Sequence, residues 1–478
     1  MGAATHPLWS DSTIEDSDRE LDMLVEAGAN VVRIDLSWSS LEETAKNAHA
    51  QWYVNKADTF FLHARERGLR VIATLSTTPC WASTAPPEAK QNCVGAWWEP
   101  GRDVHLYPPA DPADFADAAA WVAERWGDDL AALEIWNEPN CTCWFKSPNP
   151  VPEYAELLKR SYRSIKQVAP AVQVLGASLL FSDAPFLQAL YEHGIGPHLD
   201  AVSIRPFSQG RDPADPTPPN GDRRRSYLEG VPWIREVMVA NGDAHKRLWF
   251  TEIGWSSCSP WSTQNHWCIG ADLQASYLGA ALRIIRDRWD FVEAVSVYNL
   301  RNKGTDPTDR ETQMGLLHRD FTPKPAYWAF KDALADLAAN PLPRADPTAG
   351  QVSSAAVVSG PTADLTAPVL SQLRIRPRVL RANRRRARIA FSVSEPARVK
   401  LTLERARRRA GCRADCTRWR GLRGSLVHAA TGGPNRMRFT GMLRGRRLVP
   451  GSYRLSAVAR DPAGNESPVR RIRLRILP

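Results

Sequence analysis

The chain has 478 residues and a net charge of +10. No apolar run approaches the roughly 20 residues that a membrane-spanning helix needs, so we expect no membrane span. From Leu370 onward there are 29 Arg and Lys against 5 Asp and Glu, a net charge of +24, whereas the residues before Leu370 carry −14, which indicates two domains with different surfaces.

Up to about residue 340, apolar strand-like runs alternate with amphipathic helix-like runs. We predict strands at 2–6, 31–36, 70–76, 172–177, 199–205 and 294–300 and in the runs beginning at 133 and 247, and helices at 16–27, 55–67, 111–126, 153–168, 185–191, 223–240, 272–289 and 324–339. Eight sequential parallel strands with right-handed helical crossovers close most naturally into a (β/α)₈ TIM barrel. We therefore predict an α/β catalytic domain at residues 1–340.

The remainder changes character twice. Residues 341–368 are rich in Pro, Ala, Ser, Gly and Thr and are predicted to be a linker. Residues 369–478 are basic, with apolar and polar residues alternating at 387–393, 397–403, 437–443, 452–459 and 469–477 and a predicted turn at 461–465. This pattern predicts a small antiparallel β-sandwich. It weakly resembles the immunoglobulin-like or fibronectin-like accessory modules of exported hydrolases.

The eight cysteines fall in local pairs, which are Cys80 and Cys93, Cys141 and Cys143, Cys258 and Cys268, and Cys412 and Cys416. An even number in loop-like sequence predicts disulfide bonds and a secreted or cell-surface protein, although the N-terminus carries no signal-like segment. The sequence leaves the connectivity open. We expect a bond across Cys141-Thr142-Cys143 to be strained, so that one of these two cysteines pairs elsewhere.

Two glutamates stand at the ends of predicted strands. Glu138 follows the apolar run that begins at Leu133, and Glu252 ends the run that begins at Arg247. Active sites of TIM barrels lie at the carboxyl ends of the strands. A pair of facing carboxyl groups is what glycosidic bond cleavage requires, one as acid and one as nucleophile or base. A structural carboxylate that caps a loop remains the alternative for each glutamate.

The sequences Trp136-Asn137-Glu138-Pro139-Asn140 and Phe250-Thr251-Glu252-Ile253-Gly254-Trp255 together resemble the motifs of glycoside hydrolase clan A, closest to its families 39 and 5. The resemblance covers about residues 1–338. It implies that Glu138 is the acid/base, that Glu252 is the nucleophile, and that Asn137 binds the sugar 2-hydroxyl.

Further residues extend this resemblance or depart from it. Arg33 matches the arginine on strand two that keeps the nucleophile ionised, and a plain buried ion pair is its alternative. Arg205 and Phe207 replace the His-x-Tyr unit at strand six, so Arg205 either compensates for the lost hydroxyl or binds an acidic sugar. The strand-eight tryptophan of family 5 is represented at best by Tyr298.

Several tryptophans follow predicted strand ends, where their rings could stack on the apolar faces of sugars. They are Trp38, Trp81, Trp97, Trp98, Trp144, Trp255, Trp261 and Trp267, and we take Trp38, Trp81 and Trp255 as substrate-binding candidates. Packing within loops or the core is an equal alternative for each.

The sequence thus predicts a retaining glycosidase that cleaves oligo- or polysaccharides without a metal or cofactor. It contains no phosphate-binding glycine loop, HExxH motif or G-x-S-x-G elbow. For the basic segment we expect an anionic glycan or wall polymer as partner rather than nucleic acid, with a merely solubilising surface as the alternative. A sugar-binding or adhesion protein that has lost turnover is the competing hypothesis for the whole chain.

Overall fold

The computed structural model describes residues 1–91, 93, 103–259, 266–339, 368–381, 387–395, 397–408, 417–443, 446–460, 467 and 469–477. The chain divides into two compact units, Met1–Ala345 and Asp346–Pro478. In the part of the chain that is described, no helix is long and apolar enough to cross a bilayer.

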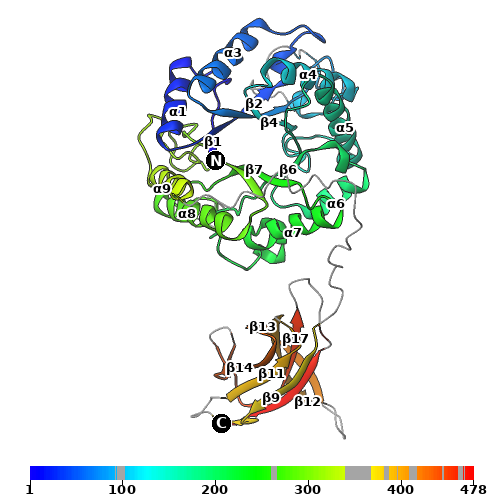
Figure 1. Ribbon diagram of the computed structural model, residues 1–478, viewed down its shortest axis with the longest axis vertical. Coiled ribbons are helices and arrows are strands. Elements are labelled where there is room, and N and C mark those ends of the chain that lie inside the picture. The colour runs from blue at the N-terminus through cyan, green and yellow to red at the C-terminus, as the bar shows by residue number, and fades with distance from the viewer. Residues whose placement is uncertain are drawn as a thin grey trace, which may run out of the picture. The chain divides into compact units, whose positions relative to one another are not determined.

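The first unit is a closed barrel of eight parallel strands, ordered sequentially from β1 to β8, so the predicted TIM barrel is confirmed (Figure 1). The strands are β1 (Gly2–Ala4), β2 (Val31–Ser37), β3 (Arg70–Ser76), β4 (Leu130–Ile135), β5 (Val174–Leu180), β6 (Ala201–Arg205), β7 (Arg247–Ile253) and β8 (Val292–Val297). Pairing of β1 with both β2 and β8 closes the barrel.

Helices surround this barrel, as Figure 1 shows. They are α1 (Ile14–Glu26), the short α2 (Trp38–Leu41), α3 (Gln51–Glu66), α4 (Pro112–Trp126), α5 (Pro150–Val168), α6 (Ala184–Glu192), α7 (Tyr227–Ala240), α8 (Ala271–Arg288) and α9 (Pro325–Ala339). Local sequence sets their ends: α4 starts where Asp111 accepts a hydrogen bond from the Ala113 N–H and Pro112 occupies the first turn. Gly28, with φ +86°, follows α1, and only glycine adopts that conformation without strain.

The barrel interior is filled in layers. Near the strand starts, a small apolar cluster packs together, formed by Ile72, Ala132, Leu175, Ala201, Trp249 and Ala294. Side chains two residues further along a strand point to the same face, and on five of the six strands these are polar, namely Thr74, Glu134, Ser203, Thr251 and Ser296; Ala177 on β5 is the exception. The apolar layer closes the amino end of the barrel, and the polar layer forms the floor beneath the carboxyl ends of the strands.

The second unit consists of antiparallel sheets, as predicted, with one short parallel pair between β10 and β18. A five-stranded sheet has the order β10-β18-β17-β12-β13, a three-stranded sheet the order β14-β11-β9, and β15 pairs with β16. The strands are β9 (Leu370–Arg376), β10 (Val379–Leu380), β11 (Ala387–Val393), β12 (Ala397–Arg408), β13 (Thr417–Ala430), β14 (Gly433–Phe439), β15 (Met442–Leu443), β16 (Arg446–Arg447), β17 (Gly451–Arg460) and β18 (Arg470–Ile476). Their inward residues form one apolar core around Ile389, Val399 and Leu455.

Some predictions for this unit need correction. The run 437–443 is not one strand, because β14 ends at Phe439 and β15 begins at Met442. Strands β9 and β13 were not predicted, since β13 contains glycines and little regular alternation. Three predicted features lie outside the described residues, namely the turn at 461–465, the pair Cys412 and Cys416, and the linker before Pro368. The immunoglobulin-like resemblance stays a prediction.

Candidate active site

A cavity of about 450 Å³ opens at the carboxyl ends of the barrel strands. Both predicted catalytic glutamates, Glu138 and Glu252, line it. So do Asn137 and Tyr298, two of the predicted substrate-binding residues. Residues that the sequence placed at three different strand ends therefore line one cavity, whose volume is in the range of small-molecule binding sites.

Glu138 is held by a turn of unusual backbone conformation. The strand β4 ends at Ile135, and Trp136 and Glu138 then take φ angles of +68° and +47°. Such left-handed conformations cost about 1–3 kcal/mol each in a non-glycine residue. The neighbouring strands compensate, because the Trp136 N–H donates to Leu75 O at 2.8 Å and the Glu138 N–H to Ser178 O at 3.0 Å. Ser178 Oγ also donates to Trp136 O at 2.7 Å, and the turn is fixed on both sides.

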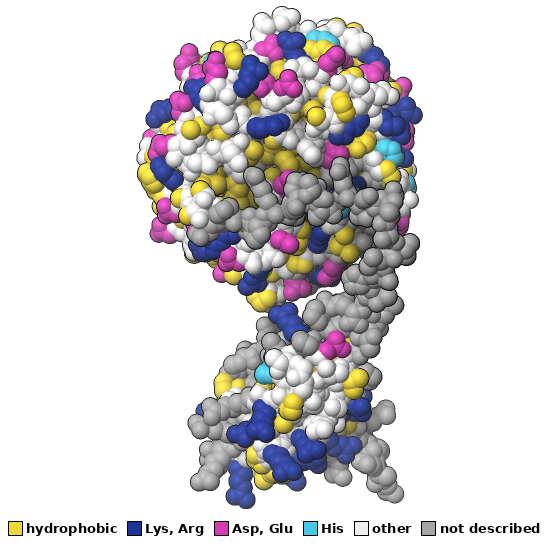
Figure 2. Space-filling model, in the orientation of Figure 1, with side chains coloured by type: hydrophobic (Ala, Val, Ile, Leu, Met, Phe, Trp, Pro, Cys, Tyr) yellow, Lys and Arg dark blue, Asp and Glu magenta, His cyan; other side chains and the backbone are white. Residues whose placement is uncertain are grey.

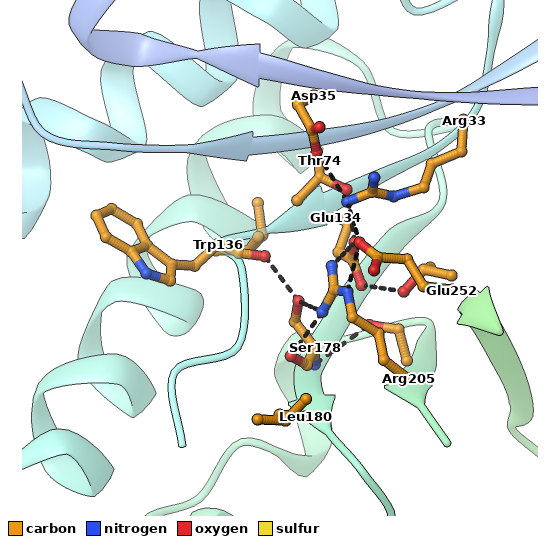
Figure 3. Close-up of polar contacts among 12 residues, drawn as sticks. Arg33, Asp35, Thr74, Glu134, Trp136, Ser178, Leu180, Arg205 and Glu252 are labelled. Carbon is orange, nitrogen blue, oxygen red and sulfur yellow. Dashed lines mark hydrogen bonds and ion pairs between the residues drawn. The ribbon is translucent and has the colours of Figure 1, made fainter. Parts of the chain in front are cut away.

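Glu252 lies between two buried arginines, as Figure 3 shows. Arg33 Nη2 is 3.0 Å from Glu252 Oε1, and Arg205 Nε is also 3.0 Å from that oxygen. The side chains of both arginines are fully buried, whereas that of Glu252 is 10% exposed toward the cavity. Two guanidinium groups therefore hold the same oxygen of Glu252 in place beside the cavity.

Arg205 is itself held in place by the polar layer of the barrel. Its Nη2 donates to Glu134 Oε2 at 2.8 Å, and its Nη1 donates to Ser178 O and Oγ, each at 2.8 Å. Glu134 also accepts from Thr74 Oγ1 at 2.6 Å and from Thr251 Oγ1 at 2.9 Å. Of the two roles left open for Arg205, the geometry favours compensation, because its guanidinium contacts Glu252 and does not line the cavity.

The pKa values of Glu138 and Glu134 shift in opposite directions. Burial raises the pKa of Glu138 to about 8; the positive charge of Arg205 opposes this shift and the negative charge of Glu252 adds to it. Burial acts on Glu134 in the same direction, but the charges of Arg205 and Arg33 outweigh it and lower its pKa. The site thus holds Glu138 as a neutral acid at pH 7 beside a carboxylate bound by two cations, which is the division of roles that glycoside cleavage needs.

Comparison with known proteins agrees with this geometry. Residues 1–176 match the family model of cellulase, glycosyl hydrolase family 5. The barrel unit is a glycosidase, and it is similar to members of glycoside hydrolase clan A. No curated protein sequence matches the chain.

Solved structures resemble this glycosidase in fold. A family 39 glycoside hydrolase from the gut symbiont Bacteroides cellulosilyticus WH2 is 18% identical with a TM-score of 0.54, over 92% of this chain and 80% of that one. A monomeric β-xylosidase from Caulobacter crescentus CB15 is 14% identical with a TM-score of 0.51, over 92% and 95%. The GH5_18 protein from Streptomyces cattleya, in complex with GlcNAc, is 18% identical with a TM-score of 0.51, over 72% and 81%.

The predicted aromatic residues divide into two groups in the glycosidase. Trp144 and Trp267 line the cavity, whereas Trp38, Trp81 and Trp255 do not. The indole N–H groups of these three bind the protein instead, since Trp38 donates to Glu42 Oε2, Trp81 to Glu42 O, and Trp255 to Ser208 Oγ. Trp38 and Trp255 are buried and pack within the protein, whereas Trp81 is half-buried, and a substrate contact for it stays a prediction. Trp97, Trp98 and Trp261 lie outside the described residues.

The glycosidase cavity also contains residues that the sequence did not reveal. Trp9 and Lys303 line it beside Tyr298, with the Lys303 ammonium 4.9 Å from the Trp9 ring centroid and 4.8 Å from that of Tyr298. Asp35 lines it too, 2.8 Å from Arg33 Nη2. The alternation of β2 gave a signal for Asp35, because it follows Arg33 by two residues and therefore shares its face.

Three disulfide bonds stabilise loops of the glycosidase, joining Cys80 to Cys93, Cys141 to Cys143 and Cys258 to Cys268. The expectation that Cys141 or Cys143 pairs elsewhere was wrong. His105 lies close to Cys80 and Cys93, but sulfurs joined to each other offer no thiolate to a metal.

Proposed function

We propose that the chain is a retaining glycoside hydrolase that cleaves O-glycosidic bonds of an oligo- or polysaccharide by double displacement. One observation carries the proposal: Glu138 and Glu252 line one cavity, one with its pKa raised to about 8 and the other ion-paired to two buried arginines. A retaining enzyme needs both states at once.

In the first step Glu138 donates its proton to the leaving glycosidic oxygen while a Glu252 oxygen attacks the anomeric carbon. The bond to the leaving oxygen breaks as the bond to Glu252 forms, and Glu138 becomes ionised. Arg33 and Arg205 both contact Glu252 Oε1 and hold the side chain in position for attack. The resemblance to clan A assigns Asn137 to the 2-hydroxyl of the same sugar, and its side chain lines the cavity.

In the second step the Glu138 carboxylate takes a proton from water, and the water oxygen attacks the anomeric carbon. The bond to Glu252 breaks, which releases the sugar with its original anomeric configuration. Glu252 is a carboxylate again, and Glu138 carries the proton taken from water. The ring faces of Trp144, Trp267 and Phe181 in the cavity wall suit the apolar faces of sugar units on either side of the cleaved bond.

The experiment is hydrolysis of a panel of 4-nitrophenyl glycosides and polysaccharides, with the anomer of the first product followed by NMR. We expect the retained anomer, and we expect Glu252→Ala to lower kcat by at least about 10⁴-fold. Glu156→Gln, an exposed carboxylate change on α5, serves as the matched control and should leave kcat unchanged. An inverted product would overturn the double displacement.

Absence of turnover on the whole panel, with sugar binding retained, would favour the competing hypothesis of a binding or adhesion protein. The three disulfide bonds of the barrel unit support our further proposal that the protein acts outside the reducing cytoplasm, secreted or at the cell surface. Export is tested separately, by locating the protein in cell fractions.

A further inference from the structure

The outer face of the five-stranded sheet in the second unit is strongly basic. Alternate residues of β12, β17 and β18 turn inward and are buried, such as Val399, Leu455 and Leu474, so the residues between them point outward. The outward polar residues of these strands are Arg398, Lys400, Thr402, Glu404, Ser452, Arg454, Ser456, Arg460, Arg471, Arg473 and Arg475. We call this set, together with Trp419, the arginine face; Glu404 is its one acidic member among the residues described.

Trp419 gives the arginine face an aromatic centre. It lies on β13 opposite Ala406 of β12, in register with the outward positions. The guanidinium carbon of Arg454 is 4.9 Å from the ring centroid, and that of Arg473 is 5.8 Å from it. A half-exposed indole is therefore flanked by two cations on an otherwise open sheet surface.

This face already binds one carboxylate in a planar, two-point geometry. Arg454 Nε donates to Glu404 Oε2 at 2.6 Å, and its Nη2 donates to Glu404 Oε1 at 2.9 Å. Arginine makes such forked pairs with carboxylates because its donors match the spacing of the two oxygens. Arg471, Arg473 and Arg475 on the adjacent strand are exposed and carry the same donors.

We propose that the arginine face binds a carboxylated polysaccharide, with one sugar ring stacked on Trp419 and uronate carboxylates paired to the β18 arginines. The choice of a polysaccharide rests on the function proposed for the barrel, and the choice of a carboxylated one rests on the charge and the fork geometry of the face. A single-stranded nucleic acid is the less suited partner, because such strands bind by stacking several bases on successive aromatic rings. Trp419 is the one aromatic ring among the described outward residues of the face.

The unit also contains a second basic surface that serves as a control. The outer face of the three-stranded sheet also presents arginines, since Arg388 lies opposite Arg376 and Ala390 lies opposite Arg374 and Arg436. These side chains are exposed, yet no tryptophan is among the described residues of that sheet. Plain charge attraction would let both basic faces contribute to binding, whereas the proposal makes only the arginine face a specific site.

The test uses the full chain carrying Glu252→Ala, so that nothing is hydrolysed, and measures binding to polygalacturonate by calorimetry and affinity electrophoresis. Fully methyl-esterified polygalacturonate supplies the same sugar without charge, chondroitin sulfate supplies sulfate groups in addition to carboxylates, and single-stranded DNA supplies phosphate. The variants are Trp419→Ala, the triple change Arg471→Ala/Arg473→Ala/Arg475→Ala, and the matched triple Arg374→Ala/Arg376→Ala/Arg388→Ala. Thermal unfolding of each variant checks that the sheets remain folded, and Trp419→Phe keeps a stacking ring if Trp419→Ala unfolds.

We expect Trp419→Ala and the β18 triple each to weaken polygalacturonate binding about tenfold, which corresponds to about 1.4 kcal/mol, and the matched triple to weaken it less than about threefold. The methyl ester should not bind. Equal losses in the two triples with no effect of Trp419→Ala would overturn the proposal in favour of plain charge attraction, as would tighter binding to DNA or chondroitin sulfate. Hydrolysis of 4-nitrophenyl glycosides by the chain with Glu252 intact is a separate readout, so failure of the barrel function is distinguished from failure of this surface.

Discussion

Arginine serves opposite purposes in the two units. In the barrel, Arg33 and Arg205 are fully buried and each contacts two carboxylates. In the second unit, arginines such as Arg471 and Arg473 are exposed on sheet faces with few acidic neighbours, and Figure 2 shows Lys and Arg predominating on the visible face of that unit while both signs of charge are spread over the barrel.

The two environments differ in how much stability is lost when an arginine is replaced. A buried ion pair gains little over an apolar pair, but removal of one partner leaves the other charge uncompensated in a medium of low dielectric constant. A surface arginine loses almost nothing when its neighbour changes, because water solvates it. Arg33 and Arg205 are therefore fixed by their buried partners, whereas Arg471 and Arg473 present their donors to solvent.

The largest effect should come from Arg205→Met. The change leaves Glu134 and Glu252 without one of their cations, so we expect a loss of about 3–5 kcal/mol in the free energy of unfolding and a fall in kcat of about 10²–10³-fold. Denaturant unfolding and steady-state kinetics measure the two. Arg374→Met, an exposed change on β9, should alter the free energy of unfolding by no more than about 0.5 kcal/mol and should leave kcat unchanged. Equal effects of the two changes would contradict the comparison.

A smaller effect should follow from Glu134→Gln, which keeps the shape of the side chain and removes its charge. Glu134 acts as a positioning residue, through Arg205, and its negative charge also raises the pKa of Glu138. We expect kcat to fall about tenfold and the basic limb of the kcat–pH profile to move to lower pH. A role limited to packing would lower kcat without moving that limb.

The raised pKa of Glu138 has a consequence for both activity and stability. Since the acid must be protonated, kcat on substrates with poor leaving groups should fall above pH 8, and less so for activated aryl leaving groups. In the unfolded chain the same carboxyl ionises near pH 4.3, so the folded state binds more protons between that pH and about 8. The free energy of unfolding should therefore fall as pH rises through this window, and Glu138→Gln should remove that part of the slope. A pH-independent difference between the two proteins would show that Glu138 is ionised when folded.

The barrel and the shared location of its two glutamates could be predicted from the sequence, because both depend on strand ends that periodicity locates. Glu138 and Glu252 follow apolar runs, and parallel strands of one barrel bring all such ends to the same rim. Arg205 was found as well, but only its contacts with Glu252 and Glu134 decide between its two possible roles.

What the sequence could not supply was the direction of side chains beyond the strands. Trp38 and Trp255 directly follow strand ends, yet both are buried in the protein, whereas Trp144, further from its strand, lines the cavity. Glu134 stayed hidden within an apolar run, since a charge between Leu133 and Ile135 gives no sign that it faces the barrel axis. In the second unit the broken alternation of β13 concealed the strand that carries Trp419.

The smallest expected effect is a gain in stability rather than a loss. Arg388 lies directly opposite Arg376 on the neighbouring strand, and like charges in that position repel. Arg388→Thr removes the repulsion and places a β-branched residue in the strand, so we expect it to stabilise the protein by about 0.2–1 kcal/mol at low ionic strength. At about 1 M salt, where the screening length is about 3 Å, the electrostatic part should vanish. Arg33→Thr in the barrel should destabilise at every salt concentration, because its charge is buried and paired. Unfolding curves at two ionic strengths would decide whether facing arginines on an exposed sheet surface lower the stability of the protein.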